Sequence, residues 1–355
     1  MKETGTKEHI QYIDILKAIA CILVLMGHVV SGLIHAGMKV SEILCYLCTY
    51  LYLFHVPCFF FASGYLYAKN PVREWKGYGS FLKKKALALG LSYVICTSFY
   101  VCLSSHFSSE MNPNTSHALK ELVNIWRKPI AQYWYLYALL ALFAVIPVIE
   151  LVFRCVNRKH ILFGFILLAC LNSSNLSFWK YVLQEGYLFY MGIVWNNLEG
   201  GGKINKWIFR YDKLIWCGVY CVESILFFGI YIFFSDINKL SSVLTIVSKN
   251  IITMLLVITM VRISYVIAKG ESWIINKLLM WVSGYSLYIY LFHTWFSGTV
   301  RIILRRMGMT NCWIQTFIGC ICGLFGSVFL AKVIKGWGIL QFWIEPLVVI
   351  RRRGR

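Results

Sequence analysis

Residues 12–34, which read YIDILKAIACILVLMGHVVSGLI, form the stretch on which the fold depends. Their length suits one helix across a bilayer, which needs about 20 residues. Asp14, Lys17 and His28 are the ionisable residues within it. On a helix with about 100° per residue, Lys17 lies roughly 20° from His28 around the axis, and Asp14 lies about 40° from His28 on the opposite side. Because ionisable groups are costly inside a membrane, this shared face is predicted to meet protein or a water-filled cavity.

The composition excludes an ordinary soluble protein. Hydrophobic residues make up 59% of the 355 residues and charged residues only 14%, which is typical of a protein that crosses the membrane several times. A net charge of +20 would suit nucleic acid, but the positive residues lie in short gaps between apolar runs, so no nucleic-acid partner is expected. The first apolar run is also too long for the core of a cleavable signal peptide.

The cysteines do not indicate a metal site. Most of the 13 cysteines lie within apolar runs, where cysteine behaves as a small hydrophobic residue. Cys45 and Cys48 have a CxxC spacing, but no second pair or histidine follows at the distance typical of zinc sites. No bound metal is therefore expected.

The apolar runs predict an all-α, polytopic integral membrane protein with about ten transmembrane helices. The polar connections are short, so residues 1–355 are predicted to form a single membrane domain, with a core over about residues 10–335 and a short basic cytoplasmic tail over 336–355. The expected spans are residues 12–34, 43–68, 82–104, 132–153, 160–177, 181–198, 213–234, 245–267, 273–296 and 312–334.

The distribution of lysine and arginine predicts the orientation. With the N-terminus inside, roughly 23 of these residues fall in cytoplasmic segments against about 10 outside, so both termini are expected in the cytoplasm of a cell with a bacterial plasma membrane. Arg301, Arg305 and Arg306 are an exception, because they form a basic cluster on the outer side. Either that segment needs positive charge, or the orientation is miscounted near the C-terminus.

The longest outer loop, about residues 105–131, is predicted to contain a short helix on the membrane surface. Its apolar residues follow helical spacing. The apolar stripe consists of Leu119, Leu122, Val123 and Trp126. Three aromatic residues follow it, Tyr133, Trp134 and Tyr135. They have two interpretations, an interfacial belt or a platform for a sugar ring, of which the belt is favoured.

His28 is the strongest candidate for chemistry. A neutral imidazole within the membrane can act as a general base or accept an acyl group, and the alternative is a structural histidine between helices. The polar face shared with Lys17 and Asp14 favours function. His35 lies on the same face, but roughly 10 Å along the axis is too far for both imidazoles to hold one metal.

The second and ninth expected spans each carry one histidine. His55 precedes Pro57, which breaks the backbone hydrogen-bond ladder of a helix, and Ser63 and Gly64 permit close approach of another helix. A kinked packing helix is the favoured interpretation of this span. His293 lies near the outer end of the ninth span, where taken alone it is interpreted as an interfacial or packing histidine.

Together these pieces resemble the acyltransferase 3 family of membrane-bound O-acyltransferases, and the pattern is closest to its fucose 4-O-acetylase-like branch. The first span of that family carries a basic residue, ten further residues and a histidine, which correspond here to Lys17 and His28, with Asp14 three positions earlier. The likeness runs from about residue 10 to residue 335. The other matching stretches are HVPCFFFASGY at residues 55–65, WYL at 134–136, YLFYMG at 187–192 and SLYIYLFH at 286–293.

Two departures from the family pattern concern donor binding. The family often has arginine where this chain has Lys17, so the charge is kept but the bidentate geometry is lost. Many members also carry an Arg-x-x-Arg pair at the start of the third span. Here Lys85 occupies the first position and Ala88 the second, which puts acyl-CoA binding at that site in question.

The resemblance implies transfer of an acyl group, usually acetyl, from cytoplasmic acyl-CoA to a hydroxyl of an envelope polysaccharide, an exopolysaccharide or a lipid-linked glycan. Acetyl-CoA, the glycan acceptor and the lipid bilayer are thus the expected partners. The expected catalytic residues are His28 and Asp14, the expected acyl-CoA-binding residues are Lys17, Lys84 and Lys85, and the expected acceptor-binding residues are His55, Trp134 and His293.

Two other classes of function stay open on the sequence. A transporter or proton-coupled carrier for envelope precursors would use His28, His55 and Glu185 as a proton relay within the membrane. An integral scaffold of a polysaccharide export complex would need none of these residues for chemistry. Acyl-CoA-dependent labelling of an acceptor distinguishes the enzyme from both.

Overall fold

The computed structural model describes residues 4–106, 122–171, 177–200, 215–237, 242–270 and 272–353, and these ranges contain helices and turns but no β-strand. The helices are α1 (Thr4–His35), α2 (Glu42–Lys69), α3 (Trp75–Lys85), α4 (Leu91–His106), α7 (Trp134–Val152), α8 (Arg158–Leu171), α9 (Ser177–Gly200), α10 (Ile215–Ile237), α11 (Ser242–Lys269), α12 (Trp273–Arg306), α13 (Cys312–Gly336), α14 (Gly338–Ile344) and α15 (Pro346–Arg353).

Seven stretches in the described ranges are long and apolar enough to cross a membrane. They lie on α1, α2, α3 with α4, α7, α10, α11 and α13. A π-helical turn over Ala86–Gly90 joins α3 to α4, so the third stretch is one helix from Trp75 to Cys102. The predicted all-α membrane fold is confirmed in this coarse form, while the number of about ten spans stays a prediction.

The remaining three predicted spans correspond to α8, α9 and α12. The described part of α8 has only 14 residues. By contrast, α12 has 34 residues, with tyrosine, serine, tryptophan and histidine along its middle. Several of these side chains are buried against protein, so α12 does not need the apolar composition of a helix that faces lipid.

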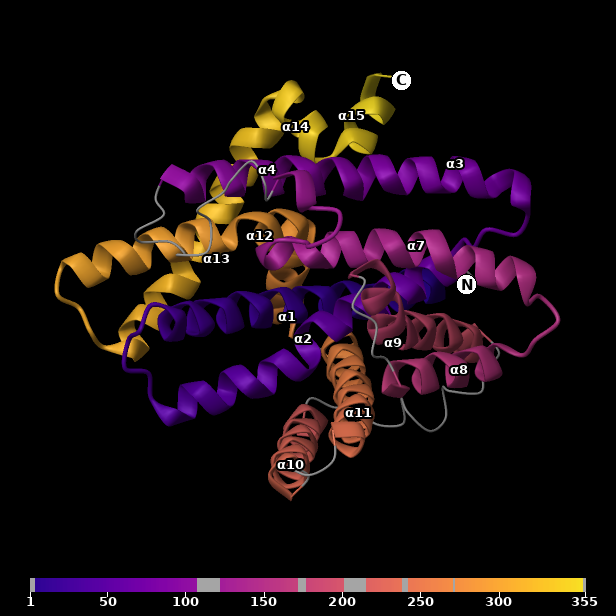
Figure 1. The fold of residues 1–355 in the computed structure, drawn as a ribbon, viewed down its shortest axis with the longest axis horizontal. Helices are drawn as coiled ribbons and strands as arrows, with labels where there is room; N and C mark the ends of the chain where they lie inside the picture. Colours follow the sequence, from indigo (N-terminus) through magenta and orange to yellow (C-terminus); the bar gives the residue numbers. More distant parts are fainter. Residues whose placement is uncertain are drawn as a thin grey trace.

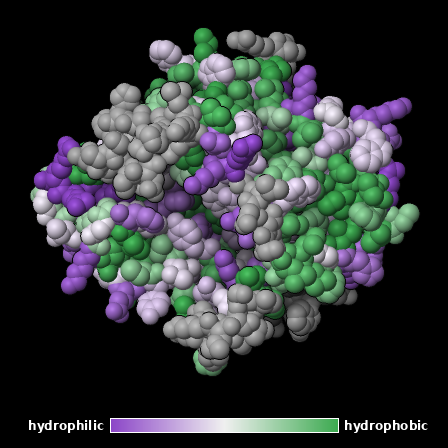
Figure 2. All heavy atoms as spheres, in the orientation of Figure 1, coloured by the Kyte–Doolittle hydropathy of each residue, from purple (hydrophilic) through white to green (hydrophobic). Residues whose placement is uncertain are grey.

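The helix α1 lies in the middle of the bundle, where it packs against α2, α11, α12 and α13. In Figure 1 the N-terminus lies to the right, whereas the α1–α2 and α12–α13 connections both lie at the left end. Apolar side chains cover large areas of the face in Figure 2, and many hydrophilic residues lie towards its left and right ends. This pattern agrees with α1, α2, α7 and the helix of α3 with α4 crossing a membrane along the horizontal direction of the view, to which α10 and α11 are steeply inclined in Figure 1.

Helices α2 and α9 pack backbone against backbone. A Cβ atom at Gly64 would overlap the carbonyl oxygen of Phe189, and one at Gly192 would overlap that of Phe61. Hydrogen is the only side chain that fits at these two positions, which confirms the prediction that Gly64 permits close approach of another helix. This contact fixes the half of α2 that follows His55.

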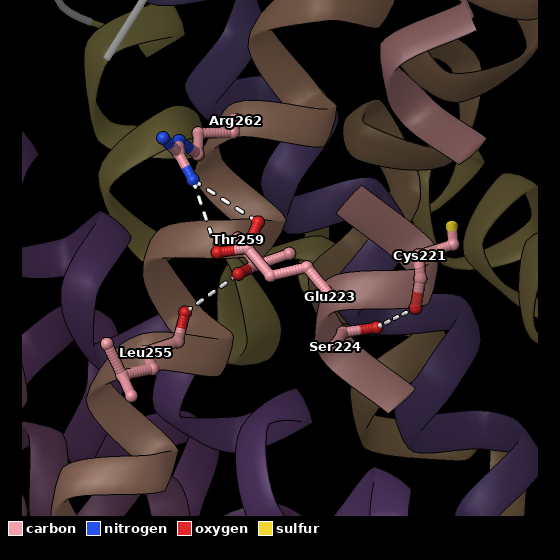
Figure 3. A network of polar contacts seen from close by, with 6 residues as sticks. All are labelled: Cys221, Glu223, Ser224, Leu255, Thr259 and Arg262. Carbon is pink, nitrogen blue, oxygen red and sulfur yellow. Dashed lines mark hydrogen bonds and ion pairs between the residues drawn. The ribbon is translucent and has the colours of Figure 1, made fainter. Parts of the chain in front are cut away.

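An ion pair joins the peripheral helix α10 to α11 (Figure 3). Arg262 Nη1 lies 3.3 Å and 3.4 Å from the two carboxylate oxygens of Glu223, and the guanidinium group lies 5.0 Å from the centre of the Tyr220 ring. On the other side of α10, Ser224 accepts a hydrogen bond of 2.6 Å from Tyr50 of α2. Pairing of this kind lowers the cost of charged residues inside apolar spans.

Tyr133 and Tyr135, at the start of α7, differ from both predictions made for them. Tyr133 is fully buried and Tyr135 is 9% exposed, and the Tyr133 hydroxyl donates to the Leu291 carbonyl at 3.1 Å. These two rings therefore form neither an interfacial belt nor an open platform for a sugar. Of the expected surface helix, Leu119 lies outside the described residues, whereas residues 122–124 are helical and Val123 and Trp126 are exposed.

Candidate active site

Three histidines that are distant in the sequence come together where α1, α2 and α12 pack. The ring centroids of His28 and His293 lie 5.2 Å apart, with the ring planes inclined by 50°. His55 is an electrostatic neighbour of both. The ring of Tyr52 connects the group, because its centroid lies 4.8 Å from that of His55 and 6.1 Å from that of His28.

The two buried histidines have defined donors and acceptors. His293 Nδ1 lies 2.7 Å from the carbonyl oxygen of Ile289, and His55 Nδ1 is hydrogen bonded to the carbonyl oxygen of Leu51. A carbonyl oxygen can only accept, so Nδ1 carries the proton in both neutral rings and Nε2 is an acceptor. Within the described residues, His293 Nε2 is buried without a hydrogen-bond partner.

A cavity of about 860 Å³ lies beside His28. His28 is partly exposed within it, and no hydrogen bond joins its ring to another residue that the structure describes. An imidazole nitrogen with a free lone pair can therefore meet a ligand in the cavity and act as a base or a nucleophile. The lining also includes Tyr52, Gln132, Trp295, Arg301 and Gln315.

One wall of the cavity is held by hydrogen bonds between α12 and the turn over Ala131–Tyr133. Gln132 Nε2 donates to Thr294 Oγ1 at 2.7 Å, and Trp295 Nε1 donates to the Tyr133 hydroxyl at 3.1 Å. Ala131, which also lines the cavity, has a φ of 48°. A non-glycine residue in this left-handed region is strained, and such strain is held in place by the surrounding contacts.

The lysine end of α1 lies well away from this cavity. Lys17 Nζ forms an ion pair of 2.7 Å with Asp14. Because α1 is continuous from Thr4 to His35, Lys17 lies roughly 16 Å and Asp14 roughly 21 Å from His28 along the axis. Asp14 therefore does not contact the His28 ring. Any catalytic role of Asp14 would be exerted beside Lys17, away from His28.

The two lysines expected at the donor site differ in their surroundings. Lys84 is exposed. Lys85 is half-buried, and its ammonium group lies 3.9 Å from the centre of the Phe143 ring and 5.5 Å from that of Phe81. Lys85 thus makes cation–π contacts with protein, which leaves Lys84 as the more accessible cation. Their roles in acyl-CoA binding stay predictions.

The residues expected to bind the acceptor do not line the large cavity. His55 and His293 are buried behind His28, and Trp134 stacks on Tyr181 with a centroid distance of 5.2 Å. The electrostatic neighbours of Glu185 are Lys249 and two tyrosines, so the structure does not place Glu185 in a relay with the histidines. In the described ranges, no group of three histidine, cysteine or acidic residues has a geometry suited to a metal ion.

Several cavity residues were not recognised as site residues from the sequence. Trp295 follows two positions after His293, so its proximity to the motif was the available signal. Gln132 and Gln315 are single polar residues beside apolar spans, and nothing in their local sequence distinguishes them. Arg301 belongs to the basic cluster that the predicted orientation places on the outer side, against the charge rule for membrane proteins, and this exception was the available signal.

The model of one protein family, described as an acyltransferase domain, matches residues 10–332 of the chain. No curated protein and no solved structure matches it.

Proposed function

The match over residues 10–332 shows that the chain belongs to this acyltransferase family, and from that premise we propose that it is a membrane O-acetyltransferase for a cell-envelope glycan. The donor is acetyl-CoA in the cytoplasm, and the acceptor is a hydroxyl of a polysaccharide, an exopolysaccharide or a lipid-linked glycan. The observation that carries the proposal is the partly exposed, unpaired His28 imidazole at the wall of the 860 Å³ cavity. Its narrower placement in the fucose 4-O-acetylase-like branch stays a prediction.

His28 acts as the general base in this proposal. Its free nitrogen takes the proton of the acceptor hydroxyl while the oxygen attacks the thioester carbonyl carbon. The C–O bond forms, the C–S bond breaks, and the imidazolium returns the proton to the departing CoA thiolate. An acyl-imidazole intermediate is the variant in which the His28 nitrogen attacks the thioester before the acceptor does.

His293 acts on His28 without touching either substrate. Its Nε2 is an acceptor with no partner in the described part of the chain, and its ring lies 5.2 Å from that of His28. A hydrogen bond from the nearer His28 nitrogen to this atom would fix the His28 tautomer. The other His28 nitrogen would then present its lone pair to the cavity. His55 and Tyr52 complete the packing around the two rings.

The donor enters from the end of α1 that carries Lys17. Lys17 and Lys84 attract the phosphates of CoA, while the pantetheine arm extends towards His28 across a distance of roughly 16 Å. The positive residues of the predicted cytoplasmic segments support this direction. The acceptor reaches His28 from the opposite end, through the cavity beside Tyr52 and Trp295, whose aromatic rings suit the apolar face of a sugar.

The test measures acetyl transfer directly. In the first experiment, the purified full-length protein in proteoliposomes receives acetyl-CoA with a radiolabelled acetyl group. In the second, glycans from cells with and without the protein are compared by mass spectrometry. We expect label to appear in a glycan ester, together with a mass increase of one acetyl group. His28→Ala should lower the rate by about 10² to 10⁴.

The matched control is His160→Ala, because His160 is exposed at the start of α8 and lies outside the cavity. Both variants should insert and accumulate like the wild type. The proposal fails if no acetyl ester forms in any glycan, or if His28→Ala retains half of the wild-type turnover. Uptake of a substrate by proteoliposomes without acetyl transfer would identify the carrier instead.

A further inference from the structure

The basic cluster at the end of α12 lines the same cavity as His28. Arg301, Arg305 and Arg306 are all part of its wall, whereas no aspartate or glutamate is. None of the acidic residues that the structure describes forms an ion pair with Arg301 or Arg305. The charges of Arg301 and Arg305 in the cavity wall are therefore not neutralised by an ion pair within the described residues.

Arg301 packs against α1 at the cavity wall. Its guanidinium group rests on Gly32, where a Cβ atom would overlap Nη1. Gly32 follows His28 by one turn of α1, or roughly 6 Å along the axis. The missing side chain at Gly32 thus makes room for a guanidinium group beside the candidate base. Since arginine presents five donors in a planar fork, it binds carboxylate and phosphate groups in bidentate geometry.

Arg305 and Gln315 also line the cavity. Arg305 uses Nη1 to donate to the Ala36 carbonyl at 3.1 Å, and no other hydrogen bond joins its guanidinium group to a residue that the structure describes. Gln315 is 2% exposed and lines the cavity. Its Nε2 donates to the Met309 carbonyl at 2.6 Å, and its Oε1 is buried without a partner in the described ranges. The buried Oε1 is out of reach of a ligand, so the free donors of Arg301 and Arg305 are the groups that would hold an anion in the cavity.

We propose that Arg301 and Arg305 form an anion subsite of the acceptor, so that the glycan acylated here carries a carboxylate or a phosphate close to the acylated hydroxyl. This inference rests on the proposed acyl transfer and adds the charge of its acceptor. In the predicted orientation these arginines lie at the outer end of the bundle, although lysine and arginine of membrane proteins usually lie in cytoplasmic segments. An acidic ligand would explain why this chain keeps arginines there.

A phosphate could also come from CoA or from a lipid headgroup. Lys17 lies roughly 16 Å from His28 towards the other end of α1, which argues against CoA as the ligand of this subsite. Arg301 lines the cavity together with His28, which favours the acceptor over a lipid headgroup. Competition by CoA, or by phosphatidylglycerol in the membrane, separates these sources.

Binding is measured without any donor, with the full-length protein in nanodiscs of phosphatidylcholine. The probes are two matched pairs, oligogalacturonate against its neutral methyl ester and maltotetraose 1-phosphate against maltotetraose. We expect at least one charged probe to bind about tenfold tighter than its neutral counterpart, with a preference that weakens as ionic strength rises. The pair that shows the preference tells carboxylate from phosphate.

Arg301→Gln should abolish the preference for charge, and Arg301→Lys should keep part of it because the charge remains without the fork. The control is Lys39→Gln, which removes one exposed charge from the α1–α2 connection outside the cavity. This control should bind like the wild type. Size-exclusion and thermal unfolding profiles show whether each variant is folded, so a loss of binding in a folded Arg301→Lys or Arg301→Gln protein is interpretable.

The inference is overturned if neither charged probe is preferred, or if Arg301→Gln leaves the preference intact. It is also overturned if CoA, or phosphatidylglycerol added to the nanodisc, displaces the charged probe, because the anion would then belong to the donor or the membrane. The proposed function has a separate outcome. Acetyl transfer to charged and neutral acceptors at equal rates would support the acyltransferase and refute the anion subsite. Arg301-dependent binding of a charged probe without any acetyl transfer would support an anion site and refute the acyltransferase.

Discussion

The ring of His28 on α1 lies 5.2 Å from the ring of His293 on α12. His28 is partly exposed at the cavity wall and has no hydrogen-bond partner in the described ranges, whereas His293 is fully buried with Nδ1 bonded to its own helix. The pair therefore combines one histidine that can meet a substrate with one that can only act through its neighbour. This division gives each residue a different expected phenotype.

Replacement of His293 tests its role as a positioning residue. His293→Ala should lower kcat by about 10-fold to 10²-fold, as loss of an orienting partner does elsewhere, and leave the KM for acetyl-CoA nearly unchanged. His293→Gln places an amide oxygen near the position of Nε2 and should recover part of kcat. His293→Asn reproduces only the Nδ1 end and should resemble alanine. Steady-state kinetics in membranes give these values, and equal kcat values for all three variants would contradict the orienting role.

The all-helical membrane fold and the polar face of α1 follow from the sequence because both depend on local pattern. Apolar length indicates a span, and a period of about 3.6 residues places Lys17 and His28 on one side of a helix. Gly64 was predictable in the same way, since a small residue at an apolar helix face commonly marks close packing.

The meeting of the three histidines was not predictable from local pattern. Periodicity tells which face of a helix a residue occupies, but not which helix faces it. Taken alone, His55 and His293 are therefore each interpreted as packing residues, and only the family resemblance assigns them to the acceptor. Tyr133 and Tyr135 were missed for a related reason, because an aromatic residue near the end of a span suits lipid headgroups and a protein interior equally well. The polar composition of α12 reflects its protein neighbours, which hydropathy does not include.

The lysine end of α1 gives a second prediction. Lys17→Ala should raise the KM for acetyl-CoA more than Lys17→Arg does, because arginine retains the charge that attracts phosphate. The dependence of the rate on acetyl-CoA concentration in membranes provides the measurement. If the alanine and arginine variants behave alike, Lys17 only anchors the helix.

Asp14→Asn is the companion variant. It removes the carboxylate 2.7 Å from Lys17, so the lysine charge becomes more available and the KM for acetyl-CoA should fall or stay unchanged. Because Asp14 lies roughly 21 Å from His28 along α1, kcat should change by less than about tenfold. A fall in kcat comparable with that of His28→Ala would instead restore the catalytic role expected from the sequence.

The sidedness of the two substrates is a third prediction. In a variant cleared of native cysteines, Lys84→Cys should react with an impermeant thiol reagent only from the cytoplasmic side and be shielded by acetyl-CoA. His35→Cys, at the exposed end of α1 beside the cavity, should react only from the outer side and be shielded by acceptor. Lys39→Cys is the control, because it lies at the same end outside the cavity and should be labelled without shielding.

Shielding by acceptor only on the cytoplasmic side would refute transfer across the membrane. Both substrates would then meet inside, and the modified glycan would be moved outward afterwards. Labelling of position 35 from the cytoplasm would reverse the orientation inferred from the loop charges.

The contact between α2 and α9 gives the last prediction. Gly64→Ala should destabilise the protein by about 1–3 kcal/mol, because its methyl group would overlap the Phe189 carbonyl oxygen and helix backbone cannot move aside as a side chain can. Gly164→Ala on α8 is the matched control, since nothing lies within 4 Å of a Cβ there. In that control alanine should be neutral or stabilising by about 0.5–1 kcal/mol, the usual gain over glycine within a helix.

Thermal unfolding of the purified variants provides the comparison. Gly192→Ala should act like Gly64→Ala, because it would overlap the Phe61 carbonyl oxygen in the same interface. The double variant should lose less stability than the sum of the two, since one separation of α2 from α9 relieves both overlaps. That separation would also shift His55 on α2, so the surviving folded fraction of Gly64→Ala should show a lower kcat than the control. A Gly64→Ala protein that unfolds at the wild-type temperature would show that α2 and α9 do not pack through their backbones.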